Sequence, residues 1–181
     1  MFEANLPAKV RCHLDNYWFL TRHFFKDAQY PIAAFFAITL IEEVGKIIIL
    51  GNRDLGGKLD RKSFYDHKRK YAYAVGMTLK VNSRVARLYE GHQGTFVNWF
   101  DEGRLFDVRN AALYLAVDEN SIQVPNESLS PSKAFLLVCV AGEIYAEIQG
   151  AYTGTDANAW KKVLDEVDEF REGYSGKKEK T

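Results

Sequence analysis

The sequence predicts an all-α protein, a bundle of about six helices, from three observations. Its apolar residues recur at helical spacing, and the alternation of a half-buried strand is absent. Prolines and small polar residues that begin helices are spread along the chain. The 181 residues are 47% hydrophobic and 14% aromatic, which is typical of a packed globular domain. No linker or repeat divides the chain, so we expect one domain over 1–172.

Start and stop signals define the helices of the first half. Pro7 begins an aromatic-rich helix, and Pro31 suits the first turn of a second one. The run GNRDLGGKLD after the second helix is a predicted loop. Asp60 or Ser63 then caps a third helix. The predicted helices of this half span 7–26, 31–50, 63–79 and 82–99.

The second half contains a shorter helix and two longer ones. Residues 105–116 form the shorter helix, and the stretch VDENSIQVPNES after it is predicted to be irregular. Ser130, followed by Pro131, begins a long helix at 130–149, and Thr155 caps a last amphipathic helix at 155–171. We expect a flexible tail at 173–181.

The charge balance gives no support for nucleic-acid binding by the whole surface, because 24 basic residues match 24 acidic ones. The charges are unevenly placed, however. Residues 53–87 carry ten Lys or Arg against three Asp, and residues 143–172 carry eight acidic residues against three basic ones. The basic segment is consistent with a surface that binds RNA or an acidic partner. It is equally consistent with helix faces that are only exposed to solvent. Both interpretations stay open.

The sequence also predicts a cytoplasmic location. The start MFEANLPAKV lacks the basic and then apolar pattern of a signal peptide. Cys12 and Cys139 form no C-x-x-C pair, so we expect reduced, buried thiols. The two most apolar runs, 32–50 and 134–149, each contain glutamates, and we therefore predict core helices and no membrane span.

The second predicted helix is apolar on nearly every side, so its charges are informative. Glu42, Glu43 and Lys46 lie in the run IEEVGK. A buried carboxylate needs a partner, because burying it alone is costly. Glu42 and Lys46 fit an i,i+4 pair at an exposed corner. Glu43 shares a stripe with Thr39 and Leu50, which predicts an inward carboxylate with a distant partner.

Two other predicted helices offer basic partners for Glu43. His67 lies on a stripe of aromatic and apolar residues, which fits either a hydrogen-bonded core histidine or a partner of the carboxylate. Arg109 repeats with apolar residues at helical spacing, so it points to the apolar side and needs an acceptor. We therefore predict a polar core cluster of Glu43, Lys46, His67, Lys70 and Arg109.

Three runs in this order resemble a known family. They are IEEVGK, FYDHKRK and FDVRNAALYLAVDEN, the last followed by Pro125. Together they resemble the AbiV-type abortive-infection proteins of bacteria, in the HEPN helical superfamily, over about residues 31–130. The resemblance implies a HEPN-like helical bundle, a homodimer and a role in phage defence. It also implies a ribonuclease motif that needs no metal ion: an Arg, often followed by Asn, and a His after four to six intervening residues.

That motif is carried over residue by residue from Arg109 and Asn110. The histidine positions hold Tyr114, Leu115 and Ala116, so the resemblance implies Arg109, Asn110 and Tyr114 as the catalytic set. A phenol has an ordinary pKa of about 10 and is no general base at neutral pH. In a regular helix, Tyr114 also points about 140° away from Arg109. The two side chains then meet only across a helix irregularity or a dimer interface.

Other signatures are weaker. Arg61 with His67 and Arg87 with His92 satisfy the bare Arg–His spacing, but chance produces such pairs in a chain with this many arginines. Zinc, di-iron and phosphate-loop patterns are absent from the sequence, and we expect no metal ion or cofactor.

Two functions stay open at this point. In the first, the protein is a metal-independent ribonuclease in which Arg109 stabilises the scissile phosphate and a nearby base activates the 2′-hydroxyl. In the second, the same scaffold is a non-catalytic module that binds a protein or nucleotide. The predicted partners are a second copy of the chain and either RNA or a phage or host protein, with no membrane.

Overall fold

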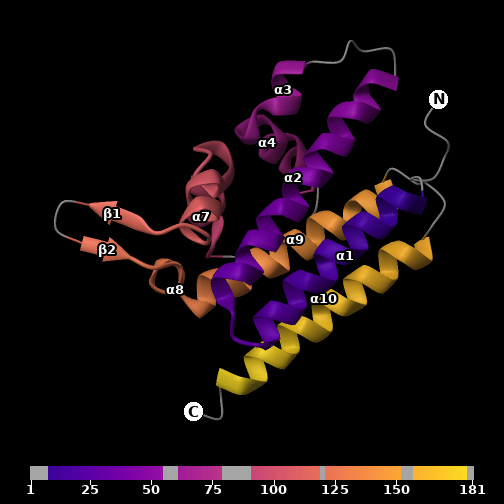
Figure 1. Ribbon diagram of the computed structural model, residues 1–181. Helices are drawn as coiled ribbons and strands as arrows, with labels where there is room; N and C mark the ends of the chain where they lie inside the picture. Colours follow the sequence, from indigo (N-terminus) through magenta and orange to yellow (C-terminus); the bar gives the residue numbers. More distant parts are fainter. Residues whose placement is uncertain (1–7, 55–60, 79–90, 119–120, 152–156, 179–181) are drawn as a thin grey trace.

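Four long helices form the body of the protein, and the all-α prediction is confirmed. The computed structural model describes residues 8–54, 61–78, 91–118, 121–151 and 157–178. Helices α1 (Ala8–Lys26), α9 (Pro131–Ala151) and α10 (Ala157–Lys178) lie side by side, and α2 (Tyr30–Asp54) packs on α1 and α9 (Figure 1). None of the helices in these ranges is long and apolar enough to cross a membrane.

Shorter elements pack against the outer side of α2. Helix α4 contacts α2 most extensively, α7 contacts both α2 and α4, and a two-stranded hairpin projects away from the bundle (Figure 1). In chain order these elements are α3 (Arg61–Tyr65), α4 (His67–Thr78), α6 (Gln93–Phe96), the π-helical turn η1 (Val97–Asp101), α7 (Leu105–Ala111), β1 (Ala116–Asp118), β2 (Ser121–Gln123) and α8 (Pro125–Ser128).

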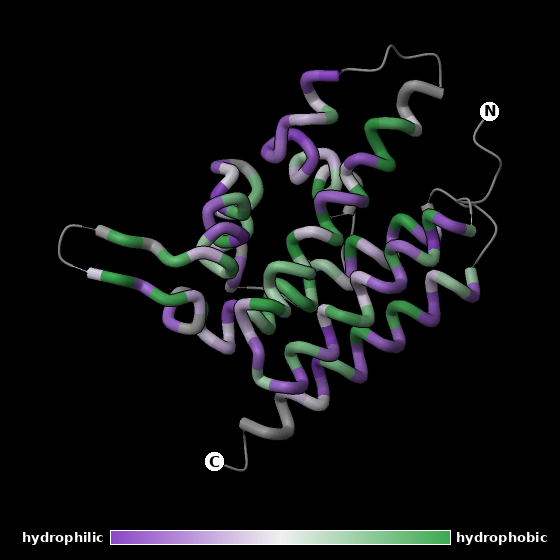
Figure 2. Tube along the Cα trace, in the orientation of Figure 1, coloured by the Kyte–Doolittle hydropathy of each residue, from purple (hydrophilic) through white to green (hydrophobic). Residues whose placement is uncertain are grey.

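The core lies where α2 and α9 meet the two amphipathic helices α1 and α10. Apolar stretches dominate α2 and α9, whereas apolar and polar residues alternate along α1 and α10 (Figure 2). Gly142 on α9 allows a close approach, because a Cβ there would lie 2.4 Å from Val167 and 2.6 Å from the Trp18 ring. Cys139 is buried as expected, but Cys12 is exposed on α1, so the prediction of two buried thiols was half wrong.

The predicted third helix is in fact two helices. Asp66 separates α3 from α4, and its carboxylate accepts a hydrogen bond from the backbone N–H of Arg69 at 3.2 Å. Asp66 thus caps α4, as aspartate commonly does at a helix start. Half of the predicted fourth helix, residues 82–90, lies outside the described residues, and its last part falls in α6 and η1.

The predicted helix at 105–116 ends early. The carbonyl of Asn110 accepts the backbone N–H groups of both Leu113 and Tyr114, at 3.1 and 2.9 Å, and α7 ends at Ala111. Ala116 belongs instead to β1, which pairs antiparallel with β2 in a register that sets Val117 opposite Ile122. The sequence prediction missed this hairpin because an apolar run as short as LYLAV fits a helix and a strand equally well.

The last helix is longer than predicted. It continues past Arg171 to Lys178, through the start of the expected tail. Tyr174 stacks on Phe135 of α9 with ring centroids 4.2 Å apart, and this contact extends the packing beyond the predicted end. Residues 179–181 lie outside the described part of the chain.

Candidate functional site

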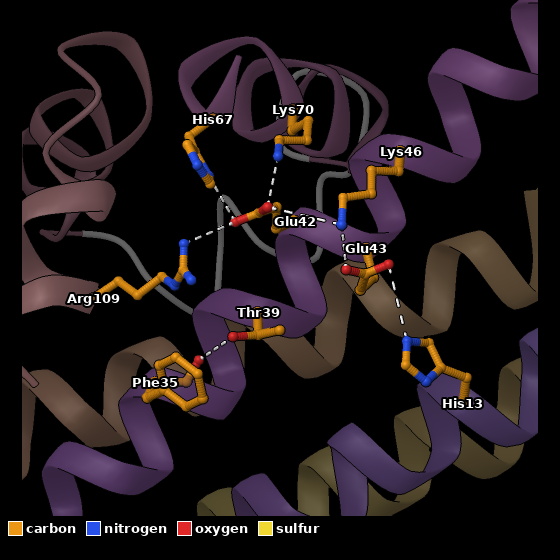
Figure 3. A network of polar contacts seen from close by, with 9 residues as sticks. All are labelled: His13, Phe35, Thr39, Glu42, Glu43, Lys46, His67, Lys70 and Arg109. Carbon is orange, nitrogen blue, oxygen red and sulfur yellow. Dashed lines mark hydrogen bonds and ion pairs between the residues drawn. The ribbon is translucent and has the colours of Figure 1, made fainter. Parts of the chain in front are cut away.

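A single buried carboxylate gathers basic side chains from two other helices. Glu42 of α2 is 6% exposed. Its Oε1 lies 2.6 Å from Lys70 Nζ, and its Oε2 lies 2.9 Å from His67 Nδ1, both on α4. The Nη1 of Arg109, on α7, approaches the same Oε2 at 3.5 Å (Figure 3). We call Glu42, His67, Lys70 and Arg109 the Glu42 cluster.

Gly45 is the reason that α4 comes so close to Glu42. A Cβ at this position would lie 2.1 Å from the backbone oxygen of Lys70, which real contacts do not allow. The absence of a side chain at Gly45 therefore lets the two helix backbones touch. Because Lys70 is fixed at this contact, its side chain meets Glu42 less than one turn away along α2.

The basic partners decide the ionisation of Glu42. Burial alone would raise its pKa, because a low-dielectric surrounding disfavours a charged carboxylate. The hydrogen bonds from Lys70 and His67, with the charges of both, outweigh burial and bring the pKa of Glu42 below its ordinary value. Lys70 is itself only 3% exposed, so this is a buried ion pair whose two members compensate for the loss of solvent around each other.

The sequence prediction chose the wrong one of two adjacent glutamates. Glu43 is half-buried, bonds Lys46 on its own helix at 2.5 Å, and lies 3.9 Å from His13 of α1. The proposed exposed pair of Glu42 and Lys46 is only a 3.9 Å contact. One residue step turns a helix by about 100°, and α4 packs on the side that Glu42 faces. The apolar pattern of α2 does not indicate which of its sides α4 packs against, so the sequence could not distinguish the two glutamates.

His67 stands between the core and solvent. Its side chain is 36% exposed, and its ring packs on that of Phe106 with centroids 4.9 Å apart. The expectation of aromatic neighbours is confirmed, because Tyr71 also lies nearby, at 6.5 Å. The bond to Glu42 uses Nδ1, and no residue in the described ranges hydrogen-bonds Nε2. This arrangement holds the ring in place and leaves the second nitrogen for a ligand.

The Arg-based motif is split between the cluster and the surface. Arg109 belongs to the cluster, with its guanidinium 5.6 Å from the Phe35 ring and 27% of its side chain exposed. Asn110 is half-buried on the last turn of α7. Tyr114 lies beyond the helix end and is 64% exposed. Within the described residues, no contact joins its side chain to Arg109.

Of the two secondary Arg–His pairs, only Arg61 with His67 lies wholly in the described part of the chain, and no contact joins those two side chains. Arg61 is exposed at the start of α3, and no ion pair or hydrogen bond links it to His67. Arg87 lies outside the described residues, and His92 is exposed. Across the described ranges, no group of three or more His, Cys, Asp or Glu side chains is arranged to hold a metal ion.

An open cleft of about 760 Å³ lies beside the cluster, and His67 forms part of its wall. Residues from α3, α4, the turn before α7, and α7 itself contribute the rest. Sequence reasoning did not find this cleft, because its two walls are more than thirty residues apart in the chain and share no motif. The lining residues are Tyr65, Asp66, His67, Lys68, Glu102, Gly103, Arg104, Phe106 and Asp107.

Comparison with known proteins agrees with the resemblance read from the three runs. The model of the AbiV family, a HEPN family, matches residues 4–146, which include the whole Glu42 cluster and the cleft. No curated protein and no solved structure matches the chain. Since the family match covers well over half of the sequence, the chain belongs to the AbiV family of HEPN proteins.

Proposed function

We propose that this abortive-infection HEPN protein is an endoribonuclease that cleaves RNA in the cytoplasm without a metal ion. One observation carries the proposal: His67 and Arg109 share the carboxylate of Glu42, and His67 also lines an open cleft. A histidine oriented by a carboxylate and accompanied by a cation is the equipment that phosphodiester cleavage through the 2′-hydroxyl requires.

The proposed chemistry assigns a separate task to each side chain. The Nε2 of His67 takes the proton of the 2′-hydroxyl, and the freed oxygen attacks the adjacent phosphorus. The bond from phosphorus to O5′ breaks, which leaves a 2′,3′-cyclic phosphate and a 5′-hydroxyl that takes a proton from the imidazolium. Arg109 stabilises the charge that develops on the phosphate oxygens. Glu42 is a positioning residue, since it holds Nδ1 and so fixes the ring.

His67 therefore replaces the histidine that the motif lacks. Imidazole changes charge close to neutral pH, as a general base must, whereas a phenol does not. Asn110 and Tyr114 keep supporting tasks in this proposal. The amide of Asn110 orients the substrate, and the exposed hydroxyl of Tyr114 contacts the substrate bound to a second copy of the chain.

A gel assay of RNA cleavage in EDTA, with thermal melts alongside, tests the proposal. We expect His67→Gln and Arg109→Ala to lower cleavage by about 100-fold or more. Asn110→Ala should have a milder effect, and Tyr114→His should raise activity if residue 114 reaches the site. Matched controls are Arg61→Ala and His92→Gln, which alter exposed residues of the two secondary pairs and should cleave like wild type.

Three results would contradict the proposal or its residues. Cleavage that persists in well-folded Arg109→Ala removes Arg109 from the site. Loss of cleavage in His92→Gln, with His67→Gln active, moves the base to the other pair. If wild type cleaves no RNA from a diverse set, and Arg109→Ala only lowers the melting temperature, the Glu42 cluster is structural and the protein is an interaction module.

The interaction module is a second candidate, and the hairpin provides the apolar surface that it needs, although a dimeric ribonuclease would use the same surface. Between residues 113 and 124 the chain exposes more large apolar side chains than any other described stretch, and we call this segment the hairpin arm. Exposed apolar patches commonly mark protein–protein contacts. Its exposed large apolar residues are Leu113, Tyr114, Leu115, Val117, Ile122 and Val124.

A second copy of the chain is the partner that we propose for the hairpin arm. HEPN domains commonly form dimers, and the arm begins three residues after Asn110. A two-fold interface through the arm would bring the motif residues of both copies together. It would also place Tyr114 of one copy near the site of the other, which the position of Tyr114 in a single chain does not achieve.

A further inference from the structure

The cleft beside His67 carries an unusual exposed aromatic side chain. Tyr65, at the end of α3, is 75% exposed, the largest fraction among the large apolar side chains in the described ranges. Its ring meets the edge of Phe64 at 5.4 Å, which holds it against the helix. On the other side of the cleft, Phe106 packs on the ring of His67. Aromatic faces therefore lie on the same cleft as the proposed base.

The cleft wall carries two cationic side chains besides His67, and they differ in their partners. Arg104 pairs with Asp107 at 3.5 Å, whereas the other two acidic residues are held by neutral donors: Asp66 by the backbone N–H of Arg69, and Glu102 by the amide of Asn98 at 2.8 Å. Lys68, by contrast, has no acidic partner in the described part of the chain.

The methylene groups of Lys68 pack against Gly103. A Cβ at Gly103 would lie 2.7 Å from Cγ, Cδ and Cε of Lys68, so only a residue without a side chain allows this contact. Gly103 also has a φ of +74°, which other residues rarely adopt. The stem of Lys68 therefore lies along the cleft wall, and Lys68 directly follows His67 in the chain.

We propose that this cleft is a nucleotide subsite, in which an unpaired base of RNA stacks on Tyr65 and a neighbouring phosphate binds Lys68. The inference rests on the proposed function in taking RNA as its ligand, and it deepens that function by naming the residues that select single strands. An exposed ring beside a cation is the usual platform for unpaired bases, whereas the bases of a duplex are stacked inside it and cannot reach such a ring. At about 760 Å³, the cleft has the size of a small-molecule site, which suits one nucleotide unit. A protein partner would instead contact a broader surface.

Binding and cleavage must be measured separately to test this subsite. We would use fluorescence anisotropy with a short single-stranded RNA whose 2′-hydroxyls are methylated, so that attack on phosphorus is blocked. Wild type would be compared with Tyr65→Ala, Tyr65→Phe and Lys68→Ala. Tyr73→Ala is the matched control, because Tyr73 is an exposed tyrosine of α4 outside the cleft. Since Tyr65 is largely exposed, its variants should keep the wild-type melting temperature.

Stacking predicts a characteristic order of affinities. Tyr65→Ala should weaken binding by about 5- to 150-fold, the loss that one stacked base causes. Tyr65→Phe retains the ring and should stay within about twofold of wild type, as should Tyr73→Ala. Lys68→Ala should weaken binding and reduce its salt dependence by about one phosphate contact. Duplex RNA should bind less tightly than the single strand.

Several outcomes would overturn the subsite. They are no binding by wild type, equal binding by Tyr65→Ala and wild type, a loss in Tyr65→Phe as large as in Tyr65→Ala, or equal binding of duplex and single strand. The result also separates the two proposals. Binding that depends on Tyr65, without any cleavage of unmodified RNA, would retain the subsite and discard the ribonuclease. Cleavage of unmodified RNA, together with binding that does not depend on Tyr65, would retain the ribonuclease and discard the subsite.

Discussion

Two neighbouring glutamates on α2 show how much a single residue step decides. Glu42 is buried and bonds α4 and α7, whereas Glu43 bonds Lys46 of its own helix and approaches only an exposed histidine. A buried charge that loses its partner is far more costly than a partly exposed one. The two positions should therefore respond very differently to the same substitution.

We expect Glu42→Ala to lower the free energy of unfolding by about 3–5 kcal/mol, because Lys70 would be left buried without a counter-ion. Glu43→Ala, the matched control, should cost about 1 kcal/mol or less. Denaturant titration of the two variants measures the difference. Equal losses would mean that the cluster is not the polar centre of the fold.

Acid should remove the contribution of Glu42. Its pKa is lowered in the folded protein, so the stabilisation is complete above the ordinary carboxyl pKa of about 4.5 and is lost as the pH falls through the folded value. The difference in unfolding free energy between wild type and Glu42→Gln should then shrink as the pH is lowered from about 6 to about 3. A difference that grows on acidification would reverse the sign of this linkage.

At the scale of secondary-structure elements, the crossing of α2 and α4 depends on Gly45. Gly45→Ala should separate the helices and cost about 1–3 kcal/mol through overpacking. Gly76→Ala is the matched control, since a Cβ at Gly76 on α4 meets nothing within 4 Å and should be neutral or slightly stabilising. Thermal melts of both variants give the comparison. A stable Gly45→Ala protein would mean that the helices can part without loss.

The long elements were predictable from the sequence, and the reason is local. Prolines near the starts of α2 and α9, and apolar residues at helical spacing, fix where these helices begin and which residues they bury. The hairpin was not predictable, because both its strands are short and because Val117 and all three side chains of β2 are exposed, so no buried face produces an alternating pattern. The break at Asp66 depends on one capping bond, which a helical period does not reveal.

The candidate site was predictable in composition but not in geometry. His67, Lys70 and Arg109 were recognised as inward basic residues, and they do converge. Their common acceptor depends on how α4 packs around α2, which is a tertiary property. The cleft depends on the same packing, and so Tyr65 and Lys68 drew no attention in the sequence.

At the scale of the whole molecule, the hairpin arm should hold two copies together. Val117 and Ile122 lie opposite each other and are 73% and 67% exposed. We expect light scattering to give twice the monomer mass for wild type and the monomer mass for the double variant Val117→Lys, Ile122→Lys. Phe19→Lys, at an exposed apolar position on α1, is the control that should remain dimeric. A monomer for wild type at all accessible concentrations would contradict the proposed interface.

The spacing of the Glu42 cluster along the chain has a consequence for synthesis. Glu42 is separated from His67, Lys70 and Arg109 by 25, 28 and 67 residues. A nascent chain whose Arg109 is still inside the ribosome therefore lacks the complete Glu42 cluster. A truncated product that ends before α7 never forms this cluster. If the protein attacks RNA, as we propose, this delay keeps the ribosome and its message away from a working nuclease until α7 has been synthesised and has left the ribosome.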